Sequence, residues 1–122
     1  MIAVALAIAL QATWPNDRPD NGWVWRGLSN NNGSILFTKP GPRPNTIWTR
    51  QELRQPDELK TLSTVTLVEA DCTGRRSRTI QGTDYIGPNL TGKSETWTGQ
   101  TWRYPVPDTI ADAILSYACD QS

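Results

Sequence analysis

Histidine is absent from this 122-residue chain, and cysteine occurs only twice. Most serine and cysteine nucleophile systems, most zinc sites and the usual proton shuttle near neutral pH depend on imidazole, so many classes of enzyme are disfavoured together. Phe and Met occur once each, whereas Trp occurs six times. This composition is typical of strands packed with large amphipathic rings and of little helical core.

Neither sign of charge is in excess, because Lys plus Arg and Asp plus Glu each number 12. A nucleic-acid partner is therefore disfavoured, since no chain-wide field attracts phosphate. The acidic residues near the N-terminus, Asp17 and Asp20, lack the spacing of an EF-hand loop, and no metal or other cofactor is predicted. The length fits one domain with one modest core.

The first ten residues are apolar throughout, in the sequence MIAVALAIAL. Such a run is too short to span a bilayer and has the length of a signal-peptide core, with a buried strand or helix as the alternative. We expect a signal peptide over residues 1–12 and hence export. Residues 13–21, rich in Pro, Asp and Asn, are predicted to be an irregular lead-in, and residues 22–122 a single domain.

A β-hairpin is predicted where residues 22–28 and 34–38 flank the turn-forming sequence SNNNG. Trp23 and Trp25 lie two residues apart, so they share one face of the strand. Two interpretations stay open: both rings cover the core, or they form an exposed pair that grips a ligand.

Residues 46–52 and 62–72 have strand character, and the second run is the longest of this kind in the chain. Thr73 and Gly74 predict a tight turn before a further strand over residues 75–81, with Gly74 supplying a positive φ.

A two-residue turn places opposite charges across this second hairpin. Asp71 then faces Arg76 and Glu69 faces Arg78, while Cys72 faces Arg75 and Leu67 faces Ile80. The two ion pairs are expected to be structural, contributing about 0.2–1 kcal/mol each. Arg75 remains without a carboxylate and joins Trp23 and Trp25 as a possible ligand surface.

One helix is predicted, over residues 108–119, with Asp108 as its cap. Its apolar stripe consists of Ile110, Ala113, Ile114, Tyr117 and Ala118. Cys119 lies beside this stripe, and in an exported chain with two cysteines its simplest use is a disulfide to Cys72. A redox-active pair is the alternative, but the Cys-x-x-Cys spacing is missing.

The segment from Gly87 to Ser94, GPNLTGKS, matches the letters of a phosphate-binding P-loop. A P-loop needs a helix directly after it, so that backbone amides can cradle phosphate. Here a Thr-rich, strand-like run follows, and Pro88 removes one amide. We therefore interpret the segment as a glycine-rich hairpin loop and predict no nucleotide cofactor.

Several of these features occur together in one known family. They are Glu69-x-Asp71-Cys72 followed by Arg75-Arg76-x-Arg78, the Gly87–Lys93 segment, Trp102 with a following Pro, and a short helix closing on Cys119. In these features the chain resembles the surface-adhesin protein E family of bacterial envelope proteins. The resemblance implies an α+β domain, mainly an antiparallel sheet with one C-terminal helix, in the periplasm or at the cell surface of a bacterium.

The resemblance also implies a non-enzymatic function, adhesion to host matrix or serum proteins in the best-known member. We expect an unidentified macromolecular partner, a host matrix or envelope protein. The alternative is a structural or assembly module of the envelope, with a homodimer formed through a sheet edge. An enzyme would have to use carboxylates such as Asp71 and Glu69, which the predicted register neutralises with arginines.

Overall fold

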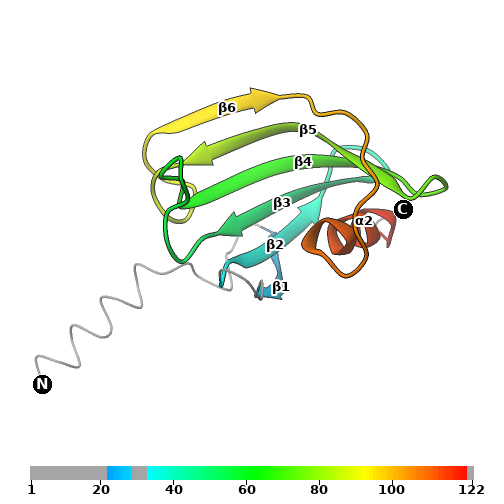
Figure 1. Cartoon of the computed structure of the whole chain (residues 1–122), viewed down its shortest axis with the longest axis horizontal. Coiled ribbons are helices and arrows are strands. Elements are labelled where there is room, and N and C mark those ends of the chain that lie inside the picture. The colour runs from blue at the N-terminus through cyan, green and yellow to red at the C-terminus, as the bar shows by residue number, and fades with distance from the viewer. Residues whose placement is uncertain (1–21, 29–32, 121–122) are drawn as a thin grey trace, which may run out of the picture.

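The computed structural model describes residues 22–28 and 33–120 (Figure 1). The predicted signal peptide (1–12), the predicted lead-in (13–21) and most of the first hairpin turn (29–32) lie outside the described residues.

The described residues form an antiparallel sheet of six strands, in which each strand pairs with the next one in sequence. The strands are β1 (Val24–Leu28), β2 (Ile35–Pro40), β3 (Thr46–Glu52), β4 (Ser63–Asp71), β5 (Arg76–Tyr85) and β6 (Ser94–Thr98). The helix α2 (Ile110–Asp120) lies against one face of the sheet (Figure 1). The predicted α+β class is thus confirmed.

The core lies between α2 and the middle of the sheet, where the helix contacts β3 and β4. It consists of Leu36, Ile47, Val68, Ala70, Ile114, Leu115 and Ala118. The helix buries Leu115 to 1% exposure, although the predicted stripe did not include this residue. The stripe is therefore rotated toward Leu115, which faces the sheet together with Ile114 and Ala118.

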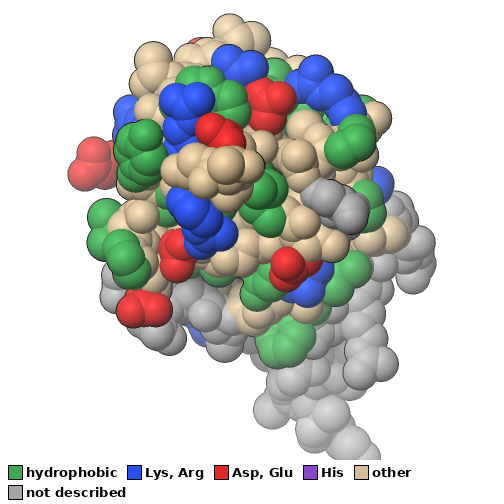
Figure 2. Space-filling model, turned by 90° about the vertical axis from the view of Figure 1, so that its right-hand side faces the viewer, with side chains coloured by type: hydrophobic (Ala, Val, Ile, Leu, Met, Phe, Trp, Pro, Cys, Tyr) green, Lys and Arg blue, Asp and Glu red, His purple; other side chains and the backbone are tan. Residues whose placement is uncertain are grey.

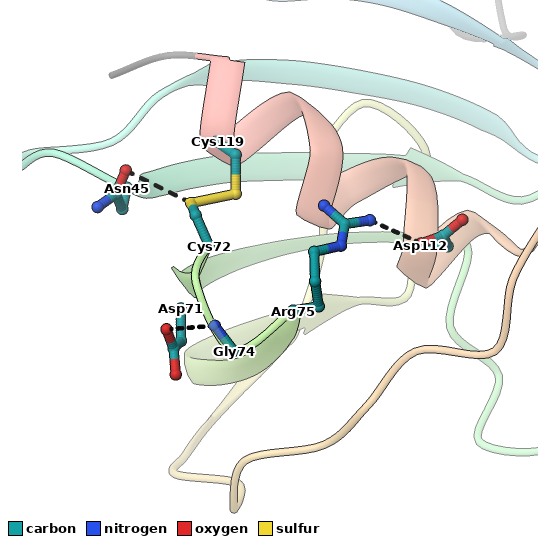
Figure 3. The surroundings of a disulfide bond; sticks show 7 residues. All are labelled: Asn45, Asp71, Cys72, Gly74, Arg75, Asp112 and Cys119. Atoms are coloured by element: carbon teal, nitrogen blue, oxygen red, sulfur yellow. Dashed lines mark hydrogen bonds and ion pairs between the residues drawn. A yellow bond between two sulfur atoms is a disulfide. The ribbon is translucent and has the colours of Figure 1, made fainter.

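Cys72 and Cys119 form the predicted disulfide, with their Cα atoms 5.8 Å apart (Figure 3). Cys72 directly follows β4, and Cys119 lies in the last turn of α2. The bond closes a separation of 47 residues, so it holds the end of the helix to the central strands.

The β4–β5 hairpin has the predicted partners Asp71 opposite Arg76 and Glu69 opposite Arg78. Other details of the prediction are wrong. A bulge after Leu67 places Gln81 opposite it, and β5 continues beyond the predicted end to Tyr85. The bulge arises because Ile80 is an extra residue on β5 in the ladder.

The turn of this hairpin has four residues, 72–75, so Cys72 does not pair with Arg75 as predicted. The positive φ belongs to Arg75, at 56°, and not to Gly74. A Cβ at position 74 would lie 2.6 Å from Oδ2 of Asp71, so a larger residue there would require this carboxylate to shift.

The cap of α2 is Thr109 and not Asp108, since the Asp112 amide donates to the Thr109 hydroxyl at 3.3 Å. Asp108 has a φ of 65° and precedes the helix. Its amide donates to Oδ2 of Asp112 at 3.2 Å. The Thr-x-x-Asp spacing therefore begins the helix one residue later than expected.

Candidate binding surface

The two tryptophans proposed as ligand contacts lie at the β1 edge of the sheet. Trp25 is in β1, opposite Phe37 of β2, and is 52% exposed. Trp23 precedes the strand and is partly buried, with Nζ of Lys39 5.3 Å from its ring centroid. Val24, between them, is also exposed. Neither tryptophan belongs to the core cluster, so β1 presents apolar side chains to solvent.

Arg75, the third proposed contact, lies elsewhere. It is at the tip of the β4–β5 hairpin, and β4 is three strands away from β1 in the sheet. Its side chain is 55% exposed and reaches Oδ1 of Asp112 on α2 at 3.3 Å (Figure 3). The structure therefore does not bring Arg75 and the tryptophans into one site.

The other two arginines of the hairpin are held by carboxylates. Nε of Arg76 donates to Asp71 at 2.8 Å, and Nε of Arg78 donates to Glu69 at 2.8 Å. Arg43 approaches the same Glu69 at 3.8 Å. This arrangement uses much of the donor capacity of Arg76 and Arg78 within the protein.

The amide of Gly74 donates to Asp71 at 3.0 Å, and Arg76 binds the same carboxylate. The Gly74 hydrogen bond, followed by that of Arg76, lowers the pKa of Asp71 below its ordinary value of 3.8. The carboxylate is therefore ionised at neutral pH and acts as the anchor of the hairpin turn.

Trp102 lies across both arginines, an arrangement that the sequence pattern did not predict. Its ring centroid is 4.7 Å from the guanidinium carbon of Arg76 and 4.8 Å from that of Arg78. Contacts of this kind favour a cation over the face of the indole. Since residue 102 comes from a different part of the chain, local spacing gave no signal for this stack.

A buried polar network lies near the opposite end of β3. Arg50 and Glu52 are paired at 2.7 Å. Arg50 also donates to Oδ1 of Asn89 at 2.8 Å, and the amide of Asn89 donates to Oε1 of Glu52 at 2.8 Å. Leu90 donates its amide to the hydroxyl of Ser63 at 2.9 Å.

These contacts show what the backbone amides of the P-loop-like segment, Gly87 to Ser94, bind in this protein. Its amides at Asn89 and Leu90, both with positive φ, bind side chains of the protein itself. β6 begins at Ser94, so a strand and not a helix follows the segment. The interpretation as a hairpin loop is confirmed.

The family model for surface-adhesin protein E matches residues 25–120, from the second residue of β1 to the last of α2. The chain belongs to the surface-adhesin protein E family. No curated protein and no solved structure matches it significantly.

The surface-adhesin protein E match includes every residue of the ion-paired hairpin, both cysteines and Trp102. Trp25 is the first matched residue, while Trp23 lies just outside the match. Family membership indicates a surface-adhesin-like protein. It does not identify which part of this domain contacts a partner, because a shared fold does not fix a binding surface.

Positive and negative charges are mixed at the end of the molecule that carries α2 and the β4–β5 turn. Figure 2 shows Lys and Arg side chains intermixed with Asp and Glu on this side. In the described part of the chain, no group of three or more His, Cys, Asp or Glu is placed to hold a metal ion. No helix among the described residues is long and apolar enough to cross a membrane.

Proposed function

We propose that this protein is a non-enzymatic, exported domain of a bacterial surface or periplasm that binds a macromolecule through its β1 edge. Family membership supports the adhesion-type role. The observation that carries the choice of surface is the exposure of Trp25 and Val24, at 52% and 46%, on a strand at the edge of the sheet.

An edge strand offers two means of recognition. One row of its backbone N–H and C=O groups points away from the sheet and can pair with an extended segment of a partner. An exposed tryptophan beside this row can act as an anchor, since Trp is enriched among the residues that dominate binding energy. Both features coincide in β1, which makes it the best-supported contact surface.

The bulge in β1 limits how a partner strand can be added. The register with β2 shifts between Trp25 and Gly27, and Gly27 has a φ of 125°. A bulge increases the local twist, so a partner could pair with only a few residues. Most of the affinity is therefore expected from the Trp25 side chain rather than from backbone pairing.

The experiment measures capture of extracellular-matrix and serum protein fractions on the immobilised domain, with bacterial envelope extract in parallel. Trp25→Ala should lower the affinity for a captured protein by at least about 2 kcal/mol, as expected for a tryptophan anchor. Ile86→Ala is the matched control, because Ile86 is 53% exposed but lies outside β1. Unchanged capture by both Trp23→Ala and Trp25→Ala would exclude β1 as the contact surface.

A second candidate function is an assembly module of the envelope that dimerises through a sheet edge. One observation favours it: β6 is the other edge of the sheet, four of its five residues are exposed, and no other strand of the described chain pairs with its outer side. Sedimentation at increasing protein concentration tests it. A dimer that Thr98→Lys dissociates supports this function, since a lysine on an edge opposes strand pairing, and a monomer at all concentrations excludes it.

A further inference from the structure

A cleft of about 270 Å³ lies where β5, the chain after β6 and the start of α2 come together. Residues after β6 follow the first half of β5: the Gly99 amide donates to the Ile80 carbonyl at 2.9 Å. Further along, Ser77 and Arg103 exchange two backbone hydrogen bonds of 2.9 and 2.8 Å. These bonds fix the two walls of the cleft relative to each other.

The cleft has a polar lining with hydroxyl, amide and cationic groups. Its polar side chains include those of Ser77, Thr79, Gln100, Thr101, Arg103 and Tyr104. None of the described residues that line it is acidic. Ser77 and Thr79 lie opposite the core residues Ala70 and Val68, so these hydroxyls are on the helix-bearing face of the sheet. Arg78 also lines the cleft, and its guanidinium stacks on Trp102 and pairs with Glu69.

Arg103 differs from the arginines of the β4–β5 hairpin. Arg75, Arg76 and Arg78 each bind a carboxylate of this chain. The exposed guanidinium of Arg103 has no such partner within the described residues. It therefore keeps its donors for a ligand, and its planar fork suits a carboxylate or sulfate.

The remaining polar side chains of the cleft indicate which class of ligand bears the carboxylate or sulfate. Hydroxyls and a primary amide both donate and accept hydrogen bonds, as the hydroxyls of a sugar ring require. Tyr104, 74% exposed, adds an amphipathic ring at the margin. The volume is below the range of about 300–1,000 Å³ usual for drug-sized ligands, so the cleft suits a short part of a chain.

We propose that this cleft binds an acidic saccharide, with Arg103 against its carboxylate or sulfate and the Ser, Thr and Gln side chains against its hydroxyls. This ligand class could come from a host glycosaminoglycan or from an acidic polysaccharide of a bacterial envelope. The proposal does not depend on the β1 surface, and Trp25→Ala should leave saccharide binding unchanged.

The test is an NMR titration of the ¹⁵N-labelled domain with tetrasaccharides of hyaluronan and of alginate, and with neutral maltotetraose. The acidic probes should shift amides of residues 77–79 and 99–104, and maltotetraose should not. Arg103→Gln should weaken binding about tenfold or more, as expected for loss of a hydrogen bond between charged groups. Lys93→Gln, which removes an exposed cation outside the cleft, should have no effect.

Arg103→Gln keeps the backbone bonds to Ser77, and an otherwise unchanged spectrum would establish that it folds. Thr101→Val is a second variant that removes a hydroxyl at nearly constant volume and should also weaken binding. Binding of either acidic probe supports the proposal. Tighter binding of hyaluronan assigns the ligand to host glycosaminoglycans, and tighter binding of alginate assigns it to acidic bacterial polysaccharides. The proposal is overturned if no acidic probe shifts these amides, if maltotetraose binds equally well, if Arg103→Gln binds like the parent, or if inorganic sulfate competes at the same concentration.

Discussion

Arg50 and Glu52 form an ion pair inside the protein, with Nε and Oε2 2.7 Å apart and side-chain exposures of 5% and 1%. The residues lie two apart in β3, so they share a face of the strand. Asn89 bonds to both, which satisfies further donors and acceptors and attaches the β5–β6 turn to β3. The network thus connects β3 to Asn89, which lies 39 positions after Arg50 and 37 after Glu52 in the chain.

Glu52→Gln should lower the free energy of unfolding by about 3 kcal/mol, because it leaves the guanidinium of Arg50 buried without its counter-charge. Urea denaturation at pH 7 measures this change. Glu58→Gln is the control, since Glu58 is exposed. The double variant Arg50→Met, Glu52→Leu should recover part of the loss, and an unchanged urea midpoint for Glu52→Gln alone would contradict the role assigned to the pair.

Replacing both cysteines by serine should lower the free energy of unfolding by about 4 kcal/mol, since the bond closes a loop of 47 residues. The loss should be greatest in α2, because a helix of three turns is marginal without its attachment. Denaturation in non-reducing buffer measures the stability, and amide exchange locates the loss. Equal melting temperatures for the variant and the parent would show that the disulfide does not stabilise the fold.

The lowered pKa of Asp71 predicts a pH dependence. A carboxyl whose pKa is lower in the folded state stabilises the fold above its unfolded pKa, and this contribution is lost as the pH falls through the folded pKa. Asp71→Asn should therefore be less stable than the parent at pH 7, and the difference should shrink as the pH falls below 3.8. Urea midpoints from pH 7 to 2 measure it, with Asp120→Asn as an exposed control. A difference that stays constant across this range would contradict the assignment.

Trp102→Leu should lower the free energy of unfolding by about 1–2 kcal/mol, because it removes two cation–π contacts of roughly 0.5–1 kcal/mol each. The indole packs on Arg76 and Arg78, and leucine keeps an apolar side chain without the ring quadrupole. Tyr104→Leu, at an exposed aromatic two residues away, is the control and should have little effect. NMR signals of the arginine side-chain Nε–H groups should move in the first variant only.

Local sequence pattern was sufficient to predict individual strands and the helix. The run from Thr46 to Glu52 became β3 with the predicted bounds, and the apolar spacing after Pro107 became α2. The start of α2 was placed one residue early because Asp108 and Thr109 are both suitable caps. The Thr-x-x-Asp spacing to Asp112 could have distinguished them.

The β4–β5 register, the Trp102 stack and the position of Arg75 relative to Trp25 could not be predicted from local pattern, because each depends on contacts between residues that are distant in sequence. The bulge at Ile80 changed every partner beyond it in the β4–β5 ladder, and no local signal marks such a shift. Likewise, Trp102 could be placed on the hairpin arginines only after residues 99–103 were known to follow β5. The separation of Arg75 from Trp25 also depends on the order of the strands.

The sequence by itself determined the main strand runs, the C-terminal helix, the disulfide partners and the opposite charges of the β4–β5 hairpin. Periodicity, a count of two cysteines and the spacing around a turn are local or combinatorial properties, whereas the α+β class was implied by the family resemblance. Only the tertiary structure decided which side chains remain available to a partner. Exposure depends on what the rest of the chain packs over each residue, and so Arg76 and Arg78 are bound within the fold, whereas Trp25 and Arg103 are left to solvent.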